Sequence, residues 1–254
     1  MIEKQQMIAG DRRFDLKFLL VSDPGGGKTH FCASYDLGPV HFYMLDPGGE
    51  KTIEKLLDKR KHPITIDYFS PEEPYNKLWK QIQKDHKAGF FHDMAEANGL
   101  VVLPDSLTTA NDMIIAEVAK NNGRDLMNVD KALRIQDWGQ ITQWCKTLIT
   151  TINAMPCAVA VPAHLYTDTN DDGSVSKRYP AITGQFRTHL GRYFSEVYFL
   201  YSQGKKRMLC MTEAYNFQAK SRVFQCDKME TPSLSFLAKA YMDGNLLDET
   251  LKKR

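Results

Sequence analysis

The stretch FLLVSDPGGGKTHF, residues 18–31, decides the fold expected for this chain of 254 residues. Phe18–Val21 is a short apolar run typical of a buried strand, and the segment from Thr29 predicts a helix that ends near Gly38. Residues 22–29 match the phosphate-binding pattern G-x-x-x-x-G-K-[ST], except that Ser22 replaces the first glycine. The strand–loop–helix order favours a nucleotide site over an ordinary glycine-rich turn.

Each part of this pattern has a chemical role in binding a triphosphate. Glycines let backbone N–H groups approach phosphates closely, and the start of a helix adds unpaired N–H groups. Lys28 would contact the β- and γ-phosphates, and the Thr29 hydroxyl would bind Mg²⁺. The pattern therefore predicts ATP and Mg²⁺ as cofactors. The residues expected to hold the nucleotide are Asp23, Pro24, Gly25, Gly26, Gly27, Lys28, Thr29 and His30.

The composition fits one large α/β domain with a proper core, because 43% of the residues are hydrophobic and 25% are charged. The net charge of +2 does not by itself indicate a nucleic-acid partner. Five cysteines without a C-x-x-C pair predict reduced thiols, with neither a disulfide framework nor a zinc site. With no secretory signal and no apolar run of membrane length, we expect a cytoplasmic protein without a membrane partner.

The rest of the chain predicts strands that alternate with helices and then a strand-rich end. Strands are expected at 39–46, 62–69, 99–106, 157–165, 196–201, 207–214 and 217–224, and helices at 71–89, 107–120, 130–155, 183–194 and 233–243. Residues 166–180 are the most loop-like segment. This order predicts an α/β fold with a mostly parallel sheet, flanking helices and antiparallel edge strands. We divide the chain into an N-terminal segment (1–16), an ATPase domain (17–226) and a C-terminal helical tail (227–254).

Several polar residues fall at or just past predicted strand ends, where ligands of such sheets bind. Asp105 ends a buried run and is expected to bind Mg²⁺ together with Thr29, although it can also be a turn residue that caps the next helix. Pro104 is unexpected beside it, since proline is poorly tolerated in a central strand. His164 can hydrogen-bond the γ-phosphate, or it can be a structural residue.

Two acids are candidates for the general base that activates the attacking water. Asp46 and Glu50 flank the turn after the second predicted strand. We favour Glu50, because it would remain free if Asp46 caps the turn. The alternative is that Asp46 is an ordinary acid of the turn and Glu50 is a solvated glutamate on the surface.

A strongly basic segment follows the loop-like residues 166–180. Between 177 and 222 the acids are Glu196 and Glu213. The basic residues there are Lys177, Arg178, Arg187, Arg192, Lys205, Lys206, Arg207, Lys220 and Arg222. With the aromatic Tyr166 and Tyr179 nearby, this segment either binds the phosphates and bases of single-stranded DNA or forms a solvated basic face.

The quoted stretch, together with VVLPDSLTT, AVAVPAHL, RYPAITGQFRTHLGRYFSEVYFL and FQAKSRVF, resembles RecA-like P-loop ATPases in the order of its motifs. The resemblance covers residues 17–224 and is greatest to the short, phage-encoded branch implicated in single-strand annealing and recombination. It implies a host-cytoplasmic ATPase that binds single-stranded DNA as a homo-oligomer, with ATP between subunits. A single-strand-binding protein that docks on the C-terminal ETLKKR is a further possible partner.

The resemblance also assigns roles to particular residues. Asp105 matches the Walker B acid, and His164 matches the polar residue that couples the γ-phosphate to the DNA-binding loop. Lys220 and Arg222 are two residues apart, so they share one face of the expected strand 217–224, and they match a basic pair that reaches the neighbouring subunit's nucleotide. Residues 166–183 and 121–130 match the DNA-facing loops. The resulting catalytic set is Lys28, Glu50, Asp105, His164, Lys220 and Arg222, and the DNA-binding set is Lys177, Arg178, Tyr179 and Arg187.

Other functions of a P-loop protein stay open at this point. A phosphotransferase would need an arginine-rich lid, whereas residues 166–180 carry Asp168, Asp171 and Asp172, which would repel phosphates. A nucleotide switch that recruits replication proteins would bind ATP without DNA-stimulated turnover. A helicase-like motor would need an accessory domain, and the sequence shows none.

Overall fold

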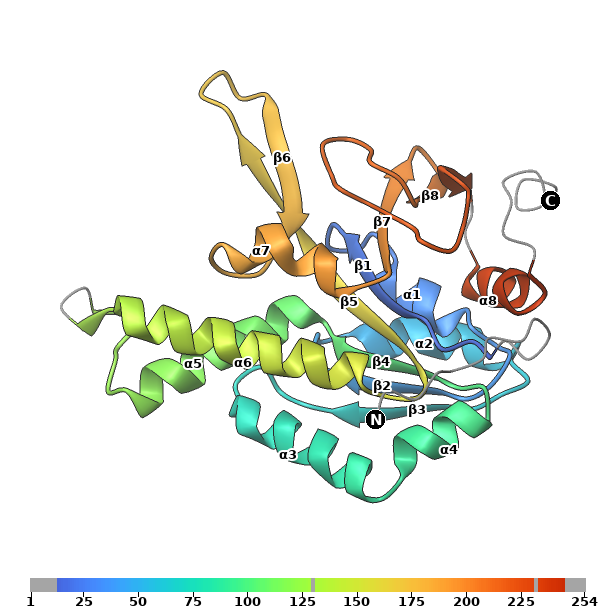
Figure 1. Ribbon diagram of the computed structural model, residues 1–254, viewed down its shortest axis with the longest axis horizontal. Coiled ribbons are helices and arrows are strands. Elements are labelled where there is room, and N and C mark those ends of the chain that lie inside the picture. Colours follow the sequence, from blue (N-terminus) through green and yellow to red (C-terminus); the bar gives the residue numbers. More distant parts are fainter. Residues whose placement is uncertain (1–12, 129–130, 231–232, 245–254) are drawn as a thin grey trace, which may run out of the picture.

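The computed structural model of this protein describes residues 13–128, 131–230 and 233–244. Within these ranges the strands form one sheet in the order β3–β2–β4–β5–β1–β7–β8–β9, and β6 pairs with β5 (Figure 1). The strands are β1 (Lys17–Ser22), β2 (Val40–Met44), β3 (Ile64–Tyr68), β4 (Leu100–Asp105), β5 (Ala158–Thr169), β6 (Val175–Pro180), β7 (Glu196–Gln203), β8 (Lys206–Cys210) and β9 (Lys228–Glu230). The helices are α1 (Lys28–Ala33), α2 (Gly49–Leu57), α3 (Tyr75–Lys87), α4 (Phe90–Glu96), α5 (Leu107–Asn121), α6 (Ile135–Asn153), α7 (Phe186–His189), the 3-10 helix η2 (Leu190–Tyr193) and α8 (Leu234–Met242).

The sheet is parallel from β3 to β7 and antiparallel from β7 to β9. Helices flank both faces of the parallel part, as the alternation of strands and helices in the sequence predicts. The fold class expected from the sequence is therefore confirmed. No helix within the described ranges combines the length and the apolar composition needed to cross a lipid bilayer.

Alternate residues of the strands enter two separate cores. Leu19 and Val21 of β1 pack into a core that contains residues of α3, α4, α5 and α6. Phe18 and Leu20 pack into the opposite core, which contains residues of α1, α2 and α8. Because successive side chains of a strand point to opposite faces, a strand buried on both faces must be apolar throughout. This explains the continuous apolar runs in the sequence.

The order of the strands brings the polar strand ends together. Strand β5 lies between β1 and β4, and its His164 is the register partner of Ser22 at the end of β1. Asp105 ends β4, the strand on the other side of β5. The P-loop, Asp105 and His164 therefore lie at one edge of the sheet.

Pro104 lies inside β4, where the pairing with β2 is irregular. The register of β2 against β4 shifts between Phe42 and Met44, and the pairing of β4 with β5 ends at Val102. The strand thus accommodates proline where the regular ladder is interrupted. Beyond it, the backbone N–H groups of Leu45 and Asp46 both donate to the carbonyl oxygen of Asp105.

The segment 166–180, expected to be a loop, is a β-hairpin instead. Strand β5 continues to Thr169 and pairs antiparallel with β6, and Figure 1 shows this hairpin standing out from the sheet. The turn is closed by hydrogen bonds from Asn170 N–H to the Ser174 carbonyl and from Gly173 N–H to the Asn170 carbonyl. Polar side chains face solvent on this exposed ribbon, so the sequence lacks the apolar alternation that indicates a half-buried strand.

The run 217–224, expected to be a strand, forms only isolated bridges at Phe217 and Lys220. The buried carboxylate of Glu196 explains the difference. It accepts hydrogen bonds from the backbone N–H groups of Arg222 and Val223 and from the Ser221 hydroxyl. These N–H groups are therefore bound to a side chain instead of a neighbouring strand, and Lys220 and Arg222 do not share a strand face as expected.

Other segments differ in extent. Helix α1 ends at Ala33 rather than near Gly38, and the expected helix 183–194 is reduced to α7 followed by η2. In the segment assigned to a C-terminal tail, β9 joins the sheet beside β8 and α8 packs into the core with α1. The terminal segments 1–12 and 245–254, including ETLKKR, lie outside the described residues.

Candidate nucleotide site and basic pocket

The loop between β1 and α1 has the backbone that its glycines permit. Gly25 and Gly27 have φ values of 72° and 99°, a region that other residues rarely adopt. A Cβ atom on Gly26 would lie 1.7 Å from the Ser22 hydroxyl oxygen. The serine that replaces the first glycine is fully buried and fills this space, so the loop forms without that glycine.

Lys28 is held across the loop rather than extended into solvent. Its Nζ donates to the carbonyl oxygens of Ser22 and Asp23, at 3.3 Å each, and lies 3.1 Å from His164 Nδ1. Burial lowers the pKa of this ammonium, and the carboxylates of Asp105 and Asp46 partly offset the effect. The lysine is therefore a buried cation surrounded by hydrogen-bond acceptors.

His164 links Lys28 to Asp46. An ammonium only donates, so Nδ1 of His164 accepts from Lys28, and the protonated Nε2 donates to Asp46 Oδ2 at 3.0 Å. Asp46 also accepts from the hydroxyls of Ser106 and Thr109. Although burial raises the pKa of Asp46, these hydrogen bonds outweigh it and the net pKa is lowered. Asp46 is a hydrogen-bonded anion that orients His164.

Thr29 and Asp105 are positioned to share a cation. The Thr29 hydroxyl donates to Asp105 Oδ2 at 3.1 Å, and Asp105 is almost fully buried. Burial, with a smaller contribution from the charge of Asp46, raises the pKa of Asp105 to about 6. Within the described residues, no cluster of three or more His, Cys, Asp and Glu forms a metal site. A hydroxyl and one buried carboxylate suit Mg²⁺, which retains waters and uses substrate phosphates as its other ligands.

Glu50, the favoured general base, lies in the first turn of α2 beyond the turn that contains Asp46. Burial raises the pKa of Tyr68 on β3, and the charge of Glu50 raises it further. Glu50 is thus near the β3 side of the site, whereas Asp46 joins the Lys28–His164 chain. We expected Asp46 to cap the turn, but its carboxylate instead binds the side chains of His164, Ser106 and Thr109. The role of Glu50 stays a prediction.

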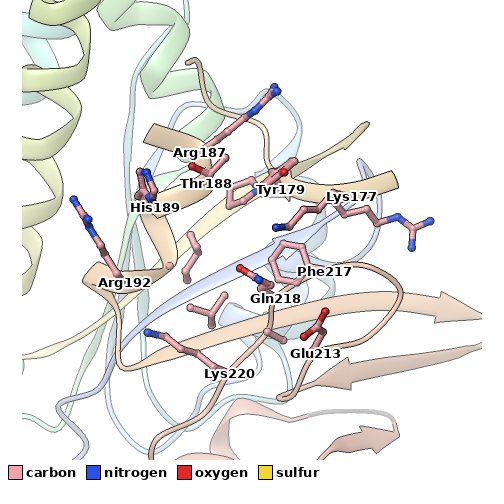
Figure 2. A pocket seen from close by; sticks show the side chains of 16 residues that line it. Lys177, Tyr179, Arg187, Thr188, His189, Arg192, Glu213, Phe217, Gln218 and Lys220 are labelled. Carbon is pink, nitrogen blue, oxygen red and sulfur yellow. The ribbon is translucent and has the colours of Figure 1, made fainter. Parts of the chain in front are cut away.

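All four predicted DNA-binding residues line one cavity of about 430 Å³, the basic pocket (Figure 2). Lys177, Arg178 and Tyr179 come from β6, and Arg187 comes from α7. His189, Arg192 and Lys220 add further basic groups, whereas Glu213 is the acidic residue among the lining residues. The structure thus brings together basic residues that are spread over more than forty positions of the sequence.

Aromatic rings and guanidinium groups are packed together beside the basic pocket. The Arg187 guanidinium carbon lies 4.4 Å from the centre of the Tyr166 ring and 5.3 Å from that of Tyr179. Arg187 Nη2 also lies 3.6 Å from Asp168 Oδ2. These contacts hold Arg187 against the hairpin and leave this part of the surface basic and aromatic.

Lys220 lines the basic pocket, so the structure places it with the predicted DNA-binding residues. Arg222 is exposed, and its backbone is bound to Glu196. The other predicted DNA-facing segment, 121–130, begins in α5, and its residues 129–130 lie outside the described residues. There, Asn122 and Arg124 both bind the carboxylate of Asp137 on α6.

A second cavity, of about 400 Å³, lies beside the P-loop. It is lined by the loop residues Ser22–Gly26, by Phe199, Tyr201 and Ser202 of β7, and by Arg178 and Tyr215. Arg178 lines this cavity as well as the basic pocket, and its Nη1 donates to the Tyr215 carbonyl at 3.0 Å. The cavity beside the P-loop and the basic pocket are therefore neighbours that share Arg178.

The sequence did not single out Arg207 for the nucleotide site. A Cβ atom on Gly27 would lie 2.7 Å from the guanidinium carbon of Arg207, so this group lies against the P-loop. The charge of Arg207 also lowers the pKa of His30, after a larger lowering by burial. In the sequence Arg207 was one member of a basic run, and no local pattern indicates its contact with a distant glycine.

One family model and several solved structures are similar to this chain. A family model described as an AAA domain matches residues 15–223. No match is found among the curated proteins. One similar solved structure is an ATPase from the type III secretion system of pathogenic bacteria, at 10% identity and a TM-score of 0.44, with 74% of this chain and 52% of that chain covered. Another is a KaiC-like protein from the hyperthermophilic archaeon Pyrococcus horikoshii OT3, at 15% identity and a TM-score of 0.41, with 85% and 84% covered.

The present chain spans about half the length of the secretion-system ATPase. The family model, in contrast, covers most of the present chain and includes the P-loop, Asp105, His164 and the basic pocket up to Lys220. The protein therefore belongs to the AAA domain family, and its nucleotide site is that of a P-loop ATPase.

Proposed function

We propose that this protein is a single-stranded-DNA-dependent ATPase that acts in annealing or recombination. The observation that supports this most strongly is the connection between its two sites. His164 contacts Lys28 through its ring, and its carbonyl oxygen accepts a hydrogen bond from the N–H of Ala181. Ala181 directly follows β6, which carries Lys177, Arg178 and Tyr179 of the basic pocket. A single residue, His164, thus contacts both the phosphate-binding lysine and the residue that ends the hairpin.

The chemistry proposed for the nucleotide site follows from the positions of its own residues. Lys28 would bind the β- and γ-phosphates of ATP, and Thr29 and Asp105 would hold Mg²⁺, which neutralises phosphate charge when bound. To reach the γ-phosphate, Lys28 must exchange its contact with His164. His164 would then be free to reorient and to move the backbone bonded to Ala181. DNA at the hairpin would affect the same residue from the other side.

The basic pocket favours the phosphates of a nucleic acid over a small acceptor substrate. Two of its cations, Lys177 and Arg178, lie on a projecting hairpin, and the rings of Tyr166 and Tyr179 lie beside Arg187 at this pocket. We further propose a homo-oligomer with ATP at the interface between subunits, where Lys220 or Arg222 would reach the neighbour's nucleotide. A single-strand-binding protein is a proposed partner.

ATP turnover with and without a single-stranded oligonucleotide, at low and moderate salt, tests the proposal. We expect DNA to increase turnover and the increase to fade with salt, because phosphate contacts displace counterions. Lys177→Gln removes one cation from the basic pocket and should raise the DNA concentration needed for half-maximal stimulation several-fold. Lys87→Gln, which removes an exposed charge at the end of α3, is the matched control.

Three outcomes would contradict the proposal, each in a different way. Turnover that is indifferent to DNA would favour a phosphotransferase or another DNA-independent hydrolase. ATP binding without turnover in either condition would favour a nucleotide switch. DNA stimulation that is equally weakened by Lys177→Gln and Lys87→Gln would remove the basic pocket as the DNA site and leave the ATPase intact.

A further inference from the structure

Arg207 is held over the P-loop by the strand that carries it. It lies on β8 directly opposite Ser202 of β7, and Ser202 lines the cavity beside the P-loop. A Cβ atom on Gly27 would lie 2.7 Å from Cζ, 2.8 Å from Nη1 and 2.9 Å from Nε of Arg207. The whole guanidinium group therefore packs against the last residue before the phosphate-binding Lys28.

The neighbouring charges distinguish Arg207 from Lys206, the other basic residue of β8. Lys206 is paired with Glu230 on β9, with 2.7 Å between Nζ and Oε1. Among the contacts of the described residues, none joins Arg207 to an acid. Arg207 is half-buried, and the charge it presents is felt at His30 on α1. A partly desolvated guanidinium without a carboxylate partner is suited to an anionic ligand.

We propose that Arg207 contacts the phosphate chain of the bound nucleotide from within the same subunit. This inference rests on the P-loop being the ATP site and is independent of DNA binding and of assembly. The guanidinium lies between Gly27 and the neighbourhood of His30, two members of the nucleotide-binding segment, so it borders the phosphates rather than the basic pocket. Its planar donors would bind two phosphate oxygens together, a contact that lysine cannot reproduce.

Nucleotide titrations of Arg207→Gln and Arg207→Lys test this role. We expect Arg207→Gln to raise the Kd for MgADP and for a non-hydrolysable MgATP analogue about tenfold, as for the loss of one charge-assisted contact. Arg207→Lys should recover part of the affinity. Lys228→Gln removes an exposed charge from β9 in the same sheet and should bind both nucleotides like the wild type.

Comparison of the two nucleotides locates the contact. If Arg207→Gln weakens the binding of MgADP and of the MgATP analogue equally, Arg207 contacts the α- or β-phosphate. If only the binding of the MgATP analogue is weakened, Arg207 contacts the γ-phosphate. Wild-type affinity of Arg207→Gln for both nucleotides would overturn the proposal. Lys28→Ala tests the premise separately, because undiminished nucleotide binding by that variant would show that the P-loop is not the site.

A measurement on the unmutated protein avoids any effect of substitution on folding. An arginine-selective reagent such as phenylglyoxal, followed by mass spectrometry, reports the reactivity of each arginine. We expect the non-hydrolysable MgATP analogue, which carries all three phosphates, to protect Arg207 and to leave Arg192 in the basic pocket reactive. Equal reactivity of Arg207 with and without the saturating analogue would contradict the contact.

Discussion

At the scale of single residues, the nucleotide site is organised by a chain of hydrogen bonds. Lys28, His164 and Asp46 form a line in which each polar atom has a defined donor or acceptor role. Asp46 accepts three side-chain hydrogen bonds, so its lone pairs are used to orient His164. This arrangement separates the two acids that the sequence left as alternatives, because an acid engaged in this way is a poor general base.

The first prediction concerns these two acids. Glu50→Gln should lower kcat for ATP about a hundredfold, a typical effect of losing a general base, and leave the Kd for MgADP unchanged. Asp46→Asn should lower kcat and also weaken nucleotide binding. The amide group of the asparagine would place a donor opposite Nε2 of His164 and so disturb the contact of that ring with Lys28. Steady-state kinetics and ADP titration of both variants check this. Wild-type kcat in Glu50→Gln would remove Glu50 from the mechanism.

At the scale of elements, the strands buried on both faces were predictable, whereas the exposed β5–β6 hairpin was not. The apolar runs of β1, β2, β4 and β5 follow from burial in two cores, so composition alone indicates them. The β5–β6 hairpin is solvated, and its residues follow no apolar pattern. In the run 217–224, an alternating pattern suggested a strand, but the carboxylate of Glu196 binds the N–H groups that a strand would use.

The site residues were also predictable only in part. Lys28, Thr29 and Asp105 belong to short motifs, and such motifs can be recognised from neighbouring residues in the sequence. The contacts of Arg207 with Gly27, and of Lys220 with the basic pocket, depend on how distant strands are ordered in the sheet. No short window of sequence contains that order.

The second prediction concerns Glu196, which anchors the segment after β8 to the start of β7. It is fully buried and accepts hydrogen bonds from Tyr198, Ser221, Arg222 and Val223. Glu196→Ala leaves these donors without an acceptor and should lower the free energy of unfolding by about 3 kcal/mol or more. Glu196→Gln, which keeps one acceptor oxygen, should cost less. Urea denaturation measures both.

The pH dependence of stability gives this prediction a second readout. Burial raises the pKa of Glu196 despite its hydrogen bonds. Since the folded-state pKa is above the unfolded value, the contribution of this group to stability is fully present below the unfolded pKa and is lost as pH rises through the folded pKa. The stability of the wild type relative to Glu196→Gln should therefore fall over that interval. A relative stability that rises with pH would contradict the assignment.

At the scale of the whole molecule, the proposed assembly makes a prediction about mixed subunits. Lys28→Ala should lack nucleotide binding but keep Lys220, and Lys220→Ala should bind ATP but lack the group offered to a neighbour. If Lys220 acts in trans, mixing the two inactive proteins should restore about a quarter of the wild-type turnover, as expected for random assembly. Turnover that stays absent on mixing would place Lys220 in its own subunit's basic pocket, where the structure has it.

The central position of β1 has a consequence for synthesis of the protein on the ribosome. The P-loop strand pairs with Val159–His164 on one side and with Glu196–Phe199 on the other. A growing chain therefore carries the complete phosphate-binding motif long before either neighbour of that strand has been translated, and pairings so distant in sequence form slowly. Nucleotide can be held firmly only after both partners have emerged. The capacity to bind ATP would thus appear late and would mark chains whose translation has passed β7.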